Sequence, residues 1–282
     1  MSERVKIILD KNADILRLPA IALRGLVVFP GNIIHFEVGR KKSIAAIEWA
    51  MSNNNAVFLT AQQDMDVEDP GFKDLYAYGV VAEVKQVLRV SDELVKVLVE
   101  GKYRAKLLTL DSSGRFLLAS TKAAALRGTK SVDSARVEAL VRSVKEAFEE
   151  YLSLNPRLSK DVVYTIITNE DAALLCDYIP ANLLLKYTDK QALLNEGTVS
   201  GRLEKLLEIL RRETKILHIE KDIQSKVNEQ MDKNQRDYYL REQMRAISNE
   251  LDDFDDTREE AEEYKAKIEK TKLPEEAREK LL

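Results

Sequence analysis

The feature that most constrains this chain is a stretch of about 50 residues without a helix breaker. From Ser200 to Leu251 there is no proline, and Gly201 is the only glycine. Good helix formers dominate, so we expect one continuous α-helix. At 1.5 Å per residue it would be roughly 75 Å long, which exceeds the width of a single domain. Part of this helix must therefore protrude or contact another chain.

The apolar residues of this helix do not keep a strict seven-residue repeat. At its centre they recur every four residues, at Ile219, Ile223, Val227 and Met231, and the polar run 234–237 then interrupts them. This spacing favours local helix pairing over a long two-stranded coiled coil. The candidate residues for assembly contacts are Met231, Tyr238, Tyr239 and Met244.

Residues 15–123 have the pattern of a β domain. In 94–100, three alternate valines share one face and Lys96 and Glu100 share the other, which is the period of a half-buried strand. Short breaks at 91–93, 101–102 and 111–114 predict antiparallel hairpins. One helix, with Ser43 as its N-cap, interrupts the strands. Together these elements predict a small, partly closed barrel.

From about residue 132 the apolar period changes to that of a helix. A helix is expected from near Asp133 to Asn155, and shorter ones at 160–168, 170–178, 181–186 and 189–195. The predicted class is therefore α+β: a β-rich pseudo-barrel, then a helical bundle, then a long protruding helix. The predicted domains are 1–125, 126–198 and 199–251, followed at 252–282 by an acidic linker and the start of another helical segment.

Composition excludes several functions. The formal net charge is −4, and the acidic excess lies in 252–282. The rest of the chain is therefore nearly neutral and lacks the positive charge that attracts nucleic acid. One cysteine and two histidines leave too few ligands for a zinc site. The free cysteine favours a reducing compartment, and neither an apolar run of membrane length nor a signal peptide is apparent. We expect a cytoplasmic protein without a membrane association.

No catalytic or cofactor motif stands out in these residues. The Gly101-Lys102 pair is followed by Tyr103, so it does not form a phosphate-binding loop. No histidine is placed beside a candidate nucleophile, and Cys176 lies on an apolar helix face, as expected for a buried side chain. The sequence therefore predicts no catalytic, cofactor-binding or metal-binding residue in this chain.

The most apolar loop-like stretch lies between Leu26 and Ile34 and contains Pro30 and Gly31. Two interpretations stay open: a core strand of the barrel, or a surface patch that binds apolar segments of another polypeptide. The residues that would form such a patch are Leu26, Val28, Phe29, Pro30, Ile33 and Ile34.

Two segments resemble a known family. Residues 18–31 (LPAIALRGLVVFPG), followed by 38–44 (VGRKKSI), resemble the start of the N-terminal domain of Lon, the ATP-dependent protease. Residues 235–247 (QRDYYLREQMRAI), followed by Glu250 and Leu251, resemble the helical run before that family's ATPase module. The resemblance extends over essentially the whole chain. The chain departs from the family pattern at Asp252, where glycine is usual, and at Pro180, where alanine is usual.

The resemblance implies a cytoplasmic, homohexameric quality-control protease with an AAA+ ATPase and a Ser-Lys dyad, both expected beyond Leu282. ATP and Mg²⁺ are expected for that parent and no cofactor for this part. The chain itself would bind unfolded, damaged or short-lived regulatory proteins and help to assemble the hexamer. A purely architectural spacer is the alternative, and a DNA-binding barrel is a weaker one because the body is nearly neutral.

Overall fold

The computed structural model describes residues 15–91, 93–128, 134–155 and 158–270. The chain divides into two units, residues 1–217 and residues 218–282. The first unit holds the β domain, the helical subdomain and the beginning of the long helix. The second unit holds the rest of that helix.

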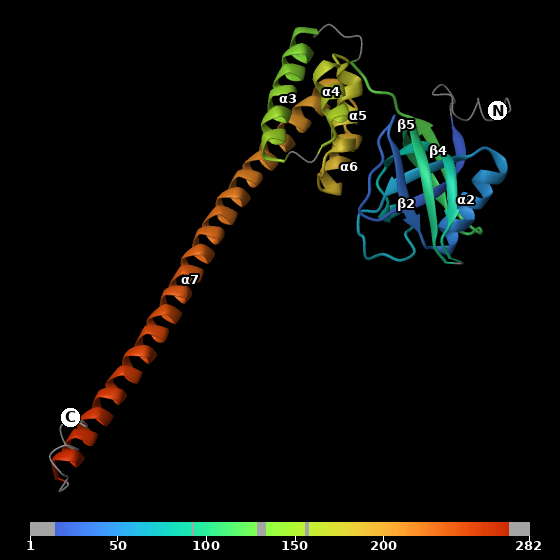
Figure 1. Cartoon of the computed structure of the whole chain (residues 1–282). Coiled ribbons are helices and arrows are strands. Elements are labelled where there is room, and N and C mark those ends of the chain that lie inside the picture. The colour runs from blue at the N-terminus through green and yellow to red at the C-terminus, as the bar shows by residue number, and fades with distance from the viewer. Residues whose placement is uncertain (1–14, 92, 129–133, 156–157, 271–282) are drawn as a thin grey trace. The chain divides into compact units, whose positions relative to one another are not determined.

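Six strands form the β domain (Figure 1). They pair in the order β2-β5-β4-β3-β1-β6, and β5 also pairs with β6, so five strands close a ring while β2 lies along the first half of β5. Strands β1 and β3 are the one parallel pair among the strands of the described residues, and this pairing follows from the crossover through β2 and α2. The strands are β1 (Leu16–Leu23), β2 (Ile33–Val38), β3 (Ala56–Ala61), β4 (Tyr78–Arg89), β5 (Val95–Asp111) and β6 (Leu117–Ala123). The predicted small β barrel is confirmed.

Strand β5 corrects one prediction. It continues through Gly101, where the sequence predicts a hairpin break. The Gly101 N–H donates to Asn32 O (2.9 Å), and the Gly31 N–H donates to Gly101 O (2.8 Å). A Cβ on Gly101 would lie 2.2 Å from Phe29 O. This glycine therefore allows two backbone segments to approach closely, and it does not mark a turn.

Helix α2 (Lys41–Asn53) covers part of the sheet and begins earlier than predicted. Its N-cap is Arg40, and Ser43 lies buried inside the first turn. The Ser43 N–H already donates to Arg40 O (2.9 Å), so the helical hydrogen bonds begin before Ser43 can cap them. A single 3₁₀ turn, η1 (Phe72–Asp74), follows β3.

In the helical subdomain, α3 (Ser134–Leu154), α4 (Lys160–Thr168), α5 (Ala172–Asn182) and α6 (Tyr187–Asn195) lie around the beginning of the long helix (Figure 1). The separate helix predicted at 181–186 is wrong: α5 continues through Pro180 to Asn182, and Leu183 is its C-cap. Ile179 and Pro180 are both buried, so core packing supports a helix that a proline would otherwise interrupt.

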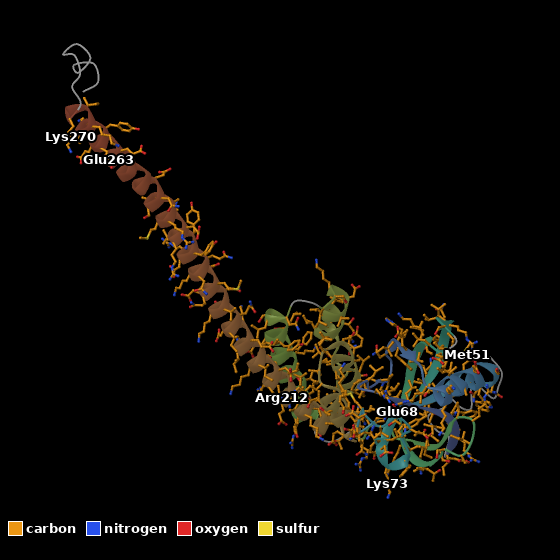
Figure 2. The ribbon with its side chains drawn as sticks, turned by 90° about the horizontal axis from the view of Figure 1, so that it is seen from below. Met51, Glu68, Lys73, Arg212, Glu263 and Lys270 are labelled. Atoms are coloured by element: carbon orange, nitrogen blue, oxygen red, sulfur yellow. The ribbon has the colours of Figure 1, made fainter. Side chains whose placement is uncertain are left out.

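The long helix, α7 (Val199–Lys270), passes through the acidic run 252–256, where the sequence predicts a break. That run contains neither glycine nor proline, and an aspartate inside a helix costs only about 0.7 kcal/mol. Its first turns are buried in the helical subdomain through Leu203, Leu206 and Leu210. From His218 to Glu250 every side chain is exposed, and Figure 2 shows side chains projecting from both visible edges of the helix beyond Arg212.

Candidate functional site

A cleft of about 710 Å³ lies between the β domain and the helical subdomain, inside the first unit. Its β-domain side includes Pro30 and the segment 123–126, which ends β6 and enters the following loop. Its helical side includes Ala173, Leu174 and Tyr178 of α5. The volume is within the range of ligand-binding clefts, and the apolar lining is typical of them.

Hydrogen bonds between the two subdomains fix the geometry around the cleft. Gln191 of α6 donates from Nε2 to Tyr78 O of β4 (2.9 Å). The Arg127 N–H donates to Gly197 O (2.9 Å), and the Val199 N–H donates back to Arg127 O (3.1 Å). These bonds use backbone groups on at least one side, so they depend on the fold more than on side-chain identity.

Arg202 holds the helical wall of the cleft together. Its side chain is fully buried and lines the cleft. It forms an ion pair with Asp177 of α5 and donates to Glu196 O (3.0 Å) and Leu194 O (3.2 Å) at the end of α6. Three helices therefore meet at one guanidinium whose charge is neutralised inside the fold.

Arg104 of β5 lies in the same cleft and has only neutral partners. Its Nη2 donates to Asn195 O (2.7 Å) and its Nη1 to Ala124 O (3.4 Å), while its guanidinium carbon lies 4.0 Å from the Tyr78 ring centroid. Nε is buried and has no acceptor. Burial, together with the charge of Arg202, lowers the pKa of Arg104 to about 10, so it remains protonated at neutral pH.

The structure separates the six residues of the predicted apolar patch. Val28 and Phe29 are buried in the core, so the core interpretation is the correct one for them. Pro30 is half-buried and lines the cleft. Leu26 and Ile34 are half-buried, and the Ile33 side chain is 60% exposed on β2. Of the six, only Pro30 lines this cleft.

Sequence reasoning missed most of the cleft. Ala123 ends β6, Ala125 and Leu126 lie in the loop that follows, and Leu174 lies in α5, on a helix that the sequence predicts without naming a partner for it. Leu174 is 40% exposed and lines the cleft. The unburied part of an apolar helix face was the one signal available, and it did not say which other segment would lie opposite.

Other candidate groups carry no reactive chemistry here. Cys176 is fully buried, and burial raises the pKa of its thiol to about 12, so it is not a thiolate nucleophile at neutral pH. Within residues 15–91, 93–128, 134–155 and 158–270, no three His, Cys, Asp or Glu side chains are grouped to hold a metal ion. In the same ranges no helix has the length and hydrophobicity needed to span a bilayer.

The predicted assembly residues all lie on the second part of α7. Met231, Tyr238, Tyr239 and Met244 are exposed there. The two tyrosines are neighbours along the helix, so they point about 100° apart.

The family model of the ATP-dependent protease La (LON) substrate-binding domain matches residues 17–212. The chain belongs to this Lon family. The Lon protease of Escherichia coli (strain K12) is 39% identical over 270 residues, which are 96% of this chain and 34% of that protein. The Lon protease of Heliobacterium modesticaldum is 39% identical over 282 residues, which are 100% of this chain and 34% of that protein.

The chain thus spans about a third of the length of these Lon proteases. The solved N-terminal domain of Mycobacterium avium complex Lon protease has the same fold, with a TM-score of 0.57 and 20% identity. That match covers 70% of this chain and 98% of the solved domain. The resemblance and the α+β fold expected from the sequence are both confirmed.

Proposed function

We propose that this Lon substrate-binding domain captures apolar segments that unfolded, damaged or short-lived regulatory proteins expose, and that the cleft beside α5 is where they bind. The observation that carries the proposal is the apolar lining of the cleft, with Leu174 still 40% exposed at its wall. A folded client hides its apolar side chains in its own core, whereas an unfolded one can place them against such a surface.

The activity of the whole protein is part of the same proposal. We propose that the full-length protein is an ATP-dependent serine protease, that ATP, Mg²⁺ and a Ser-Lys dyad act outside residues 1–282, and that it works in the cytoplasm. The cleft of one copy would bind a client weakly, so several copies would be needed for useful affinity. A homohexamer supplies those copies.

A binding experiment with matched variants tests the site. The purified chain is titrated into a fluorescent client that is folded in one sample and permanently unfolded in the other, and anisotropy is followed. We expect binding to the unfolded client only. Leu174→Ser should weaken it several-fold, while Leu184→Ser should not, because Leu184 is 76% exposed but does not line the cleft. Equal losses of affinity in the two variants would mean that any exposed leucine can bind the client and that the cleft is not the site. Absence of binding to either client would refute recognition by this domain.

A second function, assembly, is favoured by the exposed apolar stripe of α7. Ile219, Ile223, Val227 and Met231 are all exposed and follow one another at four-residue spacing, so they share one helix face. We propose that this face pairs with α7 of another copy. Ile223→Glu should lower the mass measured by light scattering, whereas Lys221→Glu, on the opposite face of the helix, should leave it unchanged. An unchanged mass in both variants would contradict the assembly role.

A further inference from the structure

Among the described residues, Arg104 is the one cation of the cleft lining that forms no ion pair with a carboxylate. Lys102 pairs with Glu83 (3.0 Å) and Glu100 (2.7 Å), and Arg202 pairs with Asp177. Arg104 has only two backbone carbonyls and the Tyr78 ring as partners.

The absence of a direct ion pair is unusual because Arg104 is only 6% exposed, and the Asp177 and Glu196 carboxylates act on it only from a longer distance. A buried charge without an opposite charge destabilises a fold, so buried arginines are normally paired. The Nε–H lacks even a neutral acceptor. The Arg104 guanidinium can therefore still form an ion pair with an anion that enters the cleft it lines.

The surroundings strengthen the effect of this charge on a ligand. The lining also contains Asp177, which pairs with Arg202, and Asp171, which accepts from backbone N–H groups of α5. Much of the rest of the lining is apolar, including Pro30, Leu126 and Leu174. In such a low-dielectric environment the attraction between a guanidinium and an anion is several times stronger than in water. Guanidinium also matches the planar geometry of a carboxylate better than ammonium does.

We propose that the cleft selects client segments in which a carboxylate stands beside apolar side chains, and that Arg104 recognises the carboxylate. The apolar neighbours of that carboxylate occupy the alanine- and leucine-lined walls. This inference rests on the proposed client-binding function and names the class of segment that the same cleft prefers. Purely apolar segments bind there too, but more weakly.

The test uses two fluorescent peptides of ten residues that are identical and apolar except for one central position, Glu in one and Gln in the other. Each is titrated with the full chain and followed by anisotropy at low ionic strength. We expect the Glu peptide to bind about tenfold more tightly, the worth of one charge-assisted hydrogen bond. The difference should shrink as salt is added.

Two variants test whether Arg104 causes the preference for the Glu peptide. Arg104→Gln should bind both peptides with the affinity that the wild type has for the Gln peptide. Arg127→Gln removes an exposed cation of the nearby loop that does not line the cleft, and it should keep the tenfold preference. A preference that survives in Arg104→Gln, or that disappears in Arg127→Gln, overturns the assignment.

The outcomes separate this inference from the proposed function. Equal binding of both peptides by the wild type overturns the inference and leaves client binding intact, whereas binding of neither peptide overturns both. If Arg104→Gln does not fold, the Nε resonance of Arg104 in the wild type replaces it. That resonance should shift more with the Glu peptide than with the Gln peptide at saturation, and equal shifts overturn the inference.

Discussion

Replacing Phe29 by alanine tests whether the segment before β2 is core or binding surface. The Phe29 side chain is 0% exposed and packs in the main hydrophobic cluster. Phenylalanine-to-alanine changes in cores cost about 3–5 kcal/mol because apolar burial is lost and a cavity remains. With a urea m-value of about 2 kcal/mol/M, a loss of about 4 kcal/mol lowers the unfolding midpoint by about 2 M.

Ile33→Ala is the matched control on the neighbouring strand. Ile33 is 60% exposed, so less than half of its side chain contributes to burial, and the expected cost is about 1 kcal/mol. Its midpoint should therefore move by about 0.5 M at most.

Urea unfolding followed by tryptophan fluorescence measures both variants. Trp49 is the only tryptophan in the chain, and its ring lies 5.6 Å from the Phe116 ring in the β domain, so its emission reports on that domain. If Phe29→Ala left the midpoint unchanged while weakening client binding, the segment would be a surface patch and the core interpretation would be refuted. Equal shifts for both variants would also refute it.

Three further predictions concern other parts of the first unit. Gly101→Ala should lower the urea midpoint strongly, because its Cβ would lie 2.2 Å from a backbone oxygen, whereas Gly114→Ala meets its nearest neighbour at 3.7 Å and should change little; similar midpoints would contradict the close approach. Cys176, whose pKa is raised to about 12 by burial, should react with a disulfide reagent at pH 8 only in urea, and rapid reaction of the folded chain would show that it is accessible. The Glu100 carboxylate accepts hydrogen bonds from Lys102 and Lys85, which hold its pKa below 4.5. The stabilisation by the ionised carboxylate is present above that pH and is lost as the pH falls through the pKa of the folded state. Glu100→Gln should therefore flatten the decline of the urea midpoint in acid, and an unchanged decline would contradict this contribution.

The cleft shows why the candidate site was only partly predictable. Its walls come from Pro30, from 123–126 and from α5, which lie up to about 150 positions apart in the sequence. Local patterns report which side chains an element will bury, but not which distant element will cover them. The only signal at 26–34 is hydrophobicity, and hydrophobicity is equally compatible with a core segment and with a binding surface. Burial then assigned Val28 and Phe29 to the core.

The sequence by itself determined the elements whose signals are local. The two-residue period of 94–100, the 3.6-residue period after 132 and the breaker-free run after Ser200 each predicted an element that the structure contains. Tertiary structure decided the conformation and burial of residues whose local sequence signals conflict or are absent. Gly101 resembles a turn residue, but the approach of the Phe29 backbone makes it part of a strand. Arg104 resembles any other arginine of a strand, and only the packing of β5 against α6 leaves it buried without a direct ion pair. Contacts between residues distant in sequence set both outcomes, because burial and Coulomb interactions depend on distance in space.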